Sequence, residues 1–413
     1  MIGFIIADMR RLWAGCLAVV LLVALATALV VAVNLQERAL RLGTARAADH
    51  FDLVIGAAGS ETQLVLSSVF LQPSPLPLMD GAILSQLAAD PRVAWVAPIG
   101  FGDSVGTYPI VGTTNVLIDN LSAVAEGMRL SKNSDAVVGS AVAIPLGFEI
   151  KPMHGMASEG GHTHTEHSYR VVGRLAPTGT AWDRAVMVPI DAVWALHGMA
   201  ETGHAAEDAD ADHDHHDGLD EEVPVNPVDE TGAKGKPGVP AVLVKPKSIA
   251  DAYKLRQEYR TDRTLAVFPG EVLTNLYASL GDARAILAIV AIGAQGLVAA
   301  ALLLVTVVHL GQRRRQIAAL RALGAPRFAI STIVWSQLFV LFALGIGLGF
   351  YLGYGATVVV SRYLTSESGV LLPVEFAVGD WWEAAALIGF AALLSALPAL
   401  LAYRQSPANA LRA

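Results

Sequence analysis

Cysteine and charge are both scarce in this chain. Its 413 residues include a single cysteine, Cys16, and only 16% are charged, whereas 54% are hydrophobic. One cysteine excludes an intramolecular disulfide, so every folded part must be stabilised by its own core. The excess of apolar over charged residues is unusual for a soluble protein and indicates a membrane protein.

Sequence motifs for nucleotide hydrolysis and for zinc-dependent hydrolysis are also missing. The chain has no G-x-x-x-x-G-K-[ST] loop, and residues 232–238, although rich in glycine and lysine, lack the spacing and the hydroxyl that phosphate and Mg²⁺ require. No H-E-x-x-H motif is present either. We therefore expect a chain that is not an enzyme and that does not hydrolyse ATP itself.

Four apolar runs are each longer than the roughly 20 residues that a helix needs to cross the hydrocarbon of a bilayer. We expect transmembrane helices at residues 12–33, 282–310, 328–360 and 381–403. Ionisable side chains are almost absent from these runs, which argues against a secondary transporter and against a metal ion permease. The first run begins like a secretory signal but is longer than a cleaved one, so we expect a retained signal anchor, with cleavage as the alternative.

Arginines near the ends of the runs predict the orientation in the membrane. They are Arg10, Arg11, Arg313, Arg314, Arg315, Arg321, Arg327, Arg404 and Arg412. All of them flank the runs on one predicted side, while the acidic residues gather in the long segment on the other side. By the positive-inside rule, residues 1–11 and 404–413 are cytoplasmic, and residues 34–281 and 361–380 lie outside the cytoplasm.

The long segment 34–281 carries both strand and helix patterns. Residues 51–56, 93–97, 108–113 and 169–173 have strand patterns, and residues 80–87 and 249–259 have helix patterns. We therefore expect an α/β extracytoplasmic domain inserted between the first two membrane helices. The predicted fold class is a membrane protein with four transmembrane α-helices and this one α/β domain.

Histidine is concentrated in two polar insertions of this domain, residues 154–167 and 201–222. The histidines are His154, His162, His164, His167, His204, His213, His215 and His216. Imidazoles, together with the aspartates of the second insertion, suit Zn²⁺, Cu²⁺ or Ni²⁺. We expect zinc or another transition metal to bind these His-rich loops. The alternative is a solvated acidic loop whose histidines bind metal weakly or not at all.

The third apolar run contains two overlapping G-x-x-x-G units, formed by Gly345, Gly349 and Gly353. In lipid, small residues let two helix backbones approach closely, so this face is expected to pack against another helix of this chain or of a second copy. The alternative is that these glycines only reflect the general frequency of glycine in membrane helices.

A basic amphipathic segment, residues 311–327, lies between the second and third runs. At about 100° per residue, Ile317, Leu320 and Leu323 share one face of a helix, while Arg314 and Arg321 lie on the opposite one. We expect the apolar ridge to bind a cytoplasmic partner. The alternative is a helix that lies in the membrane interface with this ridge in lipid.

Two motifs at matching topological places resemble the MacB/FtsX-like permeases of ABC transporters. One is the Arg-rich run 312–327 with its Gln-Ile and Leu-Gly-Ala elements, and the other is the C-terminal run 398–412. Short apolar motifs at 137–147, 169–175 and 185–190 follow in the order of that family's outer domain. The residues to which the resemblance assigns ATPase coupling are Arg313, Arg314, Arg315, Ile317, Leu320, Arg321, Leu323 and Gly324.

The resemblance implies a permease subunit of the bacterial inner membrane, bound to a separate cytoplasmic ABC ATPase and paired with a second permease copy. It implies that ATP-driven movement of the outer domain exports a substrate or acts on a periplasmic partner protein. Beyond zinc at the His-rich loops we expect no cofactor, and we expect no nucleic acid partner. The insertions lie outside the resemblance and suggest metal-linked work. The alternative function is a metal-sensing or metal-buffering membrane protein that signals without transport.

Overall fold

The structure is a computed structural model and describes residues 9–48, 50, 52–72, 74–154, 162–163, 168–197, 237–276, 278, 289–290, 292–293, 295–296, 299–300 and 326–404. The chain divides into two compact units. The helical unit comprises Met1–Leu40, Leu280–Arg362 and Pro373–Ala413. The sheet unit comprises Arg41–Ser279 and Tyr363–Leu372.

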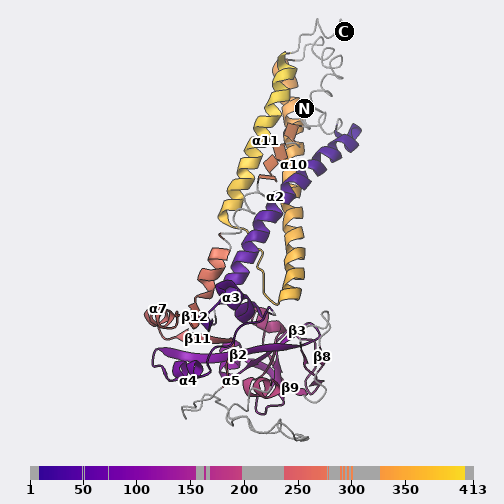
Figure 1. Ribbon diagram of the computed structural model, residues 1–413. Helices are drawn as coiled ribbons and strands as arrows, with labels where there is room; N and C mark the ends of the chain where they lie inside the picture. Colours follow the sequence, from indigo (N-terminus) through magenta and orange to yellow (C-terminus); the bar gives the residue numbers. More distant parts are fainter. Residues whose placement is uncertain are drawn as a thin grey trace, which may run out of the picture. The chain divides into compact units, whose positions relative to one another are not determined.

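Long apolar helices form the helical unit. They are α2 (Trp13–Ala47), α10 (Arg327–Ser368) and α11 (Val378–Arg404), which lie side by side in Figure 1. Within the residues that the structure describes, these 3 helices are long and apolar enough to cross a membrane. The fourth predicted span, residues 282–310, lies mostly outside those residues and stays a prediction.

Side chains from all three helices pack together in the helical unit. Phe342 and Ile346 of α10 and Ala391 of α11 are buried, and Val23 of α2 packs against them. Trp335 of α10 also donates a hydrogen bond of 3.0 Å from Nε1 to a backbone carbonyl of α11. Aliphatic and aromatic contact thus holds the bundle together, as expected for helices in lipid.

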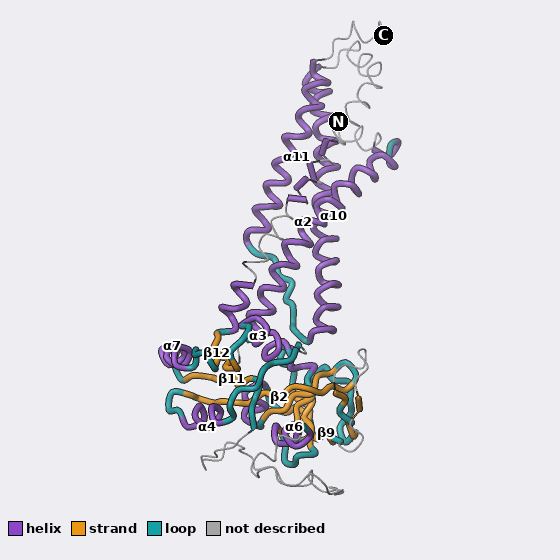
Figure 2. Tube along the Cα trace, in the orientation of Figure 1, coloured by secondary structure: helices purple, strands orange, loops and turns teal. Residues whose placement is uncertain are grey.

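The sheet unit is a mixed α/β domain, with its strands orange and its short helices purple in Figure 2. Its strands are β1 (Leu53–Ala57), β2 (Val93–Val105), β3 (Tyr108–Thr113), β4 (Val124–Gly127), β5 (Asp135–Val138), β6 (Glu149–Ile150), β7 (Met153–His154), β8 (His162–Thr163), β9 (Tyr169–Leu175), β10 (Val186–Pro189), β11 (Ala241–Pro246) and β12 (Thr264–Val267). Its helices are α3 (Glu61–Phe70), α4 (Ala82–Ala89), α5 (Asn115–Leu121), the 3₁₀ helix η2 (Ala181–Arg184), α6 (Ile190–Leu196) and α7 (Ile249–Glu258).

The long strand β2 joins the two halves of the sheet. The strand order is β12-β1-β11-β2-β3-β10-β5-β9-β4, with β6 beside β9 and β7 between β2 and β8. Only the pairs β3–β10 and β5–β9 are parallel among the described strands. The register of β2 with β3 shifts between Gly100 and Asp103, which is the local irregularity of a β-bulge.

Two hydrophobic cores lie along this sheet. One packs α4 and α7 against β1, β2 and β11, and the other gathers apolar side chains of β3, β5, β9 and β10. The strands β5, β10 and most of β11 are buried at successive positions, as is typical of strands covered on both faces. The large buried area explains how the domain is stable without a disulfide.

Candidate transmission site

The ends of two long helices belong to the sheet unit. In α2 the residues from Arg41 onward are part of that unit, and in α10 the residues from Tyr363 onward. Both helices are continuous through the point where the two units divide. The sheet unit therefore contains the last residues of both helices.

The residues that end and follow α10 bind a turn of the sheet unit. We call residues 363–372 the return segment and residues 178–184 the docking turn. The amide of Leu371 donates a hydrogen bond of 2.9 Å to the carbonyl of Gly179. On either side of it, Val370 and Leu372 are 3% and 7% exposed, so the return segment is packed into the domain.

Close backbone approach requires glycine on both sides of this contact. Gly369 ends α10 with a φ of +75°, a conformation that favours glycine. A Cβ at Gly369 would lie 3.0 Å from the carbonyl oxygen of Thr180. A Cβ at Gly43 of α2 would lie 2.7 Å from the carbonyl oxygen of Leu371. The end of α2, the return segment and the docking turn therefore meet in one place within the sheet unit.

A buried carboxylate organises the docking turn. Asp183 is 7% exposed and accepts hydrogen bonds from the amide of Thr178 at 2.7 Å and from the amide of Gly179 at 2.8 Å. It also accepts one of 2.9 Å from the Thr178 hydroxyl. Next to it, Trp182 is fully buried and anchors the turn in the domain. Charge-assisted hydrogen bonds of this kind hold the Gly179 carbonyl in place for Leu371.

Arg184 links the docking turn to two further elements. Its Nη1 donates to the carbonyl of Ser366 in α10, and its Nη2 donates to the Thr107 hydroxyl at 3.2 Å. Its guanidinium lies 5.3 Å from the centre of the Tyr108 ring, within the range of a cation–π interaction. The last turn of α10 is therefore connected to the turn between β2 and β3.

In the helical unit, the predicted G-x-x-x-G face lies against α2 of the same chain. A Cβ at Gly345 would lie 2.7 Å from Val23 Cβ, and one at Gly349 would lie 2.5 Å from Thr27 Cβ. A Cβ at Gly353 would lie 2.8 Å from a backbone carbonyl oxygen of α2. The two backbones are thus too close for any larger residue on this face.

An ion pair joins α2 to the start of α11 in the same unit. The two terminal nitrogens of the Arg38 guanidinium, Nη1 and Nη2, donate to the Asp380 carboxylate, at 2.6 and 2.8 Å. Arg38 also donates to the Glu375 carbonyl, and Asn34 donates to Glu383, each at 3.1 Å. This bidentate geometry fixes the angle between the two helices more firmly than a single contact would.

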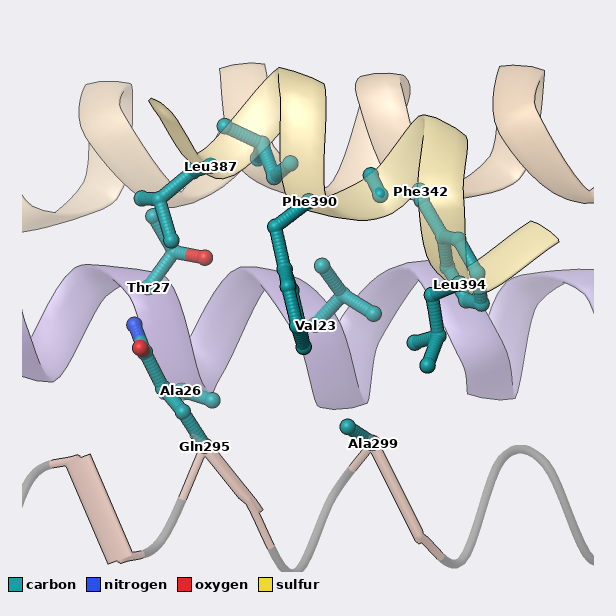
Figure 3. A pocket seen from close by; sticks show the side chains of 11 residues that line it. Val23, Ala26, Thr27, Gln295, Ala299, Phe342, Leu387, Phe390 and Leu394 are labelled. Atoms are coloured by element: carbon teal, nitrogen blue, oxygen red, sulfur yellow. The ribbon is translucent and has the colours of Figure 1, made fainter. Parts of the chain in front are cut away.

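A small pocket of about 70 Å³ opens between these helices and the residues Gln295 and Ala299. Its lining is almost entirely apolar, as Figure 3 shows, with Phe342, Phe390 and Leu394 among the side chains. Its polar side chains are those of Thr27 and Gln295, and the Gln295 amide points toward α2 (Figure 3). Such a lining suits apolar contact.

The predicted ATPase-coupling residues lie outside the described part of the chain. These are Arg313, Arg314, Arg315, Ile317, Leu320, Arg321, Leu323 and Gly324. The same holds for His164, His167, His204, His213, His215 and His216. His154 and His162 are described through their backbone, in β7 and β8. Among the side chains that the structure does describe, no three His, Cys, Asp or Glu residues gather as a metal-binding group.

The docking turn and the return segment are functional candidates that sequence patterns do not reveal. Their only local signals are the glycines at 179 and 369, and glycine alone does not distinguish a close contact from an ordinary loop. The contact joins residues far apart in the chain, so it becomes visible only in the folded domain.

The fold and this site together define a class: a membrane protein whose apolar helices continue into an α/β domain. Residues 288–408 match the family model described as FtsX-like permease C-terminal. A similar solved structure is the periplasmic region of MacB from Actinobacillus actinomycetemcomitans, with 11% identity, coverage of 56% of this chain and 95% of that chain, and a TM-score of 0.32. A score of this size supports no structural argument. No curated protein matches the chain.

The family match covers the Arg-rich run 312–327 and residues 398–408 of the C-terminal run, the two motifs that carried the resemblance. It confirms the resemblance to the MacB/FtsX-like permeases over this part of the chain and supports an ABC transporter permease subunit in general.

Proposed function

We propose that this chain converts ATP hydrolysis by a separate cytoplasmic ATPase into movement of the sheet unit. The coupling segment 311–327 receives the ATPase movement, and the helices carry it to the docking turn. The domain then exports a substrate from its own side of the membrane or acts on a partner protein there. Two copies of the chain pair to match two ATPase subunits.

One observation carries this proposal: the return segment at the end of α10 is folded into the sheet unit. The hydrogen bond from the Leu371 amide to Gly179 and the one from Arg184 to Ser366 attach the end of α10 to the domain, beside the end of α2. A domain attached to the membrane helices only through the covalent chain would need no such contact. A domain that is moved by α10 needs it.

The topology belongs to the same proposal. We place residues 282–310 as a fourth membrane helix, because they are apolar over a sufficient length. The arginines at the ends of the spans then place both termini in the cytoplasm and the sheet unit outside it, at a bacterial inner membrane. With this orientation, α10 begins directly after the coupling segment and ends at the docking turn.

The test of ATPase coupling is a double substitution, Ile317→Asp with Leu320→Asp. Two carboxylates on the apolar ridge would have to be desolvated in a partner's groove, so we expect the ATPase to be lost from the complex. The measurement is affinity purification of the full chain from its own membranes in mild detergent, with mass spectrometry of the bound proteins.

The matched control changes two alanines on the opposite face of the same segment, Ala318→Asp with Ala322→Asp. It adds the same charge outside the ridge and should leave the ATPase bound. Equal recovery of the ATPase with the ridge variant and with the control would exclude the proposed coupling. Failure to recover any ABC ATPase with the unchanged chain would exclude the proposal as a whole.

A metal link is the finer part of the proposal. The His-rich insertions 154–167 and 201–222 would bind Zn²⁺ or a similar ion, which would regulate the permease or accompany its substrate. The second candidate function is a metal-sensing or metal-buffering protein that signals without transport. It is favoured by the strand pairing that sets His154 opposite His162. Zinc-stimulated ATPase activity without movement of any substrate would distinguish it.

A further inference from the structure

A groove of about 520 Å³ lies between the start of α10 and the end of α11. Each helix contributes four side chains to it: Phe328, Ser331, Thr332 and Trp335 of α10, and Ala396, Ala399, Leu400 and Tyr403 of α11. Both helices belong to the helical unit and are long and apolar enough to cross a membrane. Pockets that bind small molecules have volumes of roughly 300–1,000 Å³. The groove is therefore large enough for a ligand, unlike the small pocket beside Gln295.

The hydrogen-bond donors in the lining of this groove are used by the helices themselves. The hydroxyls of Ser331 and Thr332 donate to the carbonyl of Phe328, at 3.0 and 2.8 Å. The indole Nε1 of Trp335 donates to the carbonyl of Ala392, at 3.0 Å. Apart from the Tyr403 phenol, the other lining side chains are apolar. A polar occupant would lose its water without gaining these donors, so the lining favours a hydrocarbon chain.

The walls of the groove are preformed. The ring of Trp335 stacks on that of Phe339, with 4.9 Å between the centroids and 7° between the planes. Together with the bond to Ala392, this stacking holds the indole in one orientation. On the other wall, the small side chains of Ala396 and Ala399 leave the space open. An occupant does not have to order these side chains, which lowers the entropic cost of binding.

One end of the groove combines exposed aromatic rings with positive charge. Phe328 is 75% exposed and Tyr403 is 43% exposed. In the chain, α10 begins at Arg327 and α11 ends at Arg404, so each ring directly neighbours an arginine. Aromatic and basic residues at the end of a membrane helix are typical of the bilayer interface. Hydrocarbon lining with two positive charges at one end complements an anionic phospholipid.

Charge argues against two other occupants of the groove. The coupling segment 311–327 is itself rich in arginine, so it would bring like charges to the same end. A second copy of the chain has the same orientation in the membrane. A two-fold contact through the groove would therefore place Arg327 and Arg404 of both copies at one level, where they repel.

We propose that this groove binds an anionic phospholipid of the bilayer. An acyl chain lies against Trp335 and the two alanines, and the phosphate lies at the end where α10 begins and α11 ends. The site requires α10 and α11 to be in the membrane, but it requires neither an ATPase nor a metal. Its consequence for activity rests on the proposed function, because α10 directly follows the coupling segment and the lipid would contact the helix that receives the ATPase movement.

Tryptophan fluorescence tests the site, because Trp335 lines the groove. The full chain is reconstituted in phosphatidylcholine vesicles with increasing amounts of brominated phosphatidylglycerol or brominated phosphatidylcholine, whose bromine atoms quench an indole on contact. The difference between the unchanged chain and Trp335→Phe gives the signal of Trp335. We expect phosphatidylglycerol to bind on the order of 30-fold more tightly than phosphatidylcholine, since two arginines attract its headgroup.

One pair of variants tests the hydrocarbon contact. Ala396→Phe fills the groove and should protect Trp335 from both brominated lipids. Ala386→Phe adds the same ring at an exposed position of the same helix and should leave the quenching of Trp335 unchanged. The melting temperature of each variant shows whether it is folded.

A second pair tests the headgroup contact and leaves the groove lining intact, so it also serves if Ala396→Phe does not fold. Arg327→Gln with Arg404→Gln should abolish the preference for phosphatidylglycerol while phosphatidylcholine still quenches Trp335. Arg10→Gln with Arg11→Gln removes as many charges on the same predicted side of the membrane, at the start of another helix. This control should keep the preference.

Three results would overturn the site. Equal quenching of the unchanged chain and of Trp335→Phe would mean that no acyl chain reaches the groove. Equal affinity for the two lipids would mean that the groove takes bulk lipid without selecting an anionic headgroup. Quenching of Trp335 that appears only on dilution of the chain in excess lipid would assign the groove to a second copy. Recovery of an ATPase by co-purification is independent of all three, so the failure of this site and of the proposed function are distinguishable.

Discussion

At the scale of single residues, the docking turn depends on one carboxylate. Asp183 satisfies three donors at once, the amides of Thr178 and Gly179 and the Thr178 hydroxyl. Asparagine in its place has one acceptor oxygen and an NH₂ group that would face a donor. The stability lost with this carboxylate is larger than that lost with an exposed charge, because Asp183 is buried.

We expect Asp183→Asn to destabilise the docking turn by about 1–3 kcal/mol. Hydrogen exchange of the Thr178 and Gly179 amides in the full chain measures this directly, and both should exchange faster. The matched control is Asp119→Asn, which breaks an exposed ion pair of 2.9 Å with Arg129 and should change stability by less than about 1 kcal/mol. Unchanged protection of both amides in Asp183→Asn would contradict the role given to this residue.

At the scale of elements, the contact between α2 and α10 depends on alternate glycines of one helix. Gly345, Gly349 and Gly353 lie against α2, whereas a Cβ at Gly347 or Gly355 would meet nothing within 4 Å. The same helix therefore contains both the sensitive positions and their controls. This distinction follows from the 3.6-residue period, which puts positions four apart on one side.

We expect Gly349→Val to lower the free energy of unfolding of the purified chain by about 1–3 kcal/mol. Its Cβ would lie 2.5 Å from Thr27 Cβ, so the two helices would have to separate. Gly347→Val adds the same side chain where there is open space and should have little effect. Unfolding in mild detergent, followed by circular dichroism, compares the two. Equal melting temperatures would mean that the α2–α10 contact contributes nothing to stability.

At the scale of the whole molecule, the transmission site predicts that ATPase binding and domain movement can be separated. Gly369→Val places a β-branched residue at a φ of +75°, with its Cβ 3.0 Å from the Thr180 carbonyl oxygen. Both effects oppose the contact between the return segment and the docking turn. We therefore expect the ATPase to remain bound and active while the ATP-dependent change in the sheet unit is lost.

Limited proteolysis of the sheet unit in the purified complex, with and without ATP, measures that change. Gly355→Val in the same helix is the matched control, since a side chain there has open space, and it should retain the response. An unaltered response in Gly369→Val, together with rapid exchange of the Leu371 amide, would show that the docking turn does not transmit the movement.

Sequence patterns predict much of the sheet unit, but not all of it. The strand expected at residues 108–113 coincides with β3, because alternation and a following turn are local signals. The helix α3 is not revealed by the pattern, since its Leu, Val and Phe residues also suit a strand. The start of α3 is set by Ser60, whose hydroxyl accepts a hydrogen bond of 3.3 Å from the Gln63 amide. Its position is set by the burial of one face of the helix.

The chain's sequence by itself determined the membrane class, the long apolar helices and the α/β character of the domain. These properties follow from composition and from periodicity over a few turns, which act at short range. Only the tertiary structure decided that the glycine face of α10 meets α2, that Leu371 binds Gly179, and that Phe328 of α10 and Tyr403 of α11 line one groove. The physical reason is that such contacts join distant segments whose pairing is selected by packing of the whole unit, and no local pattern specifies the partner.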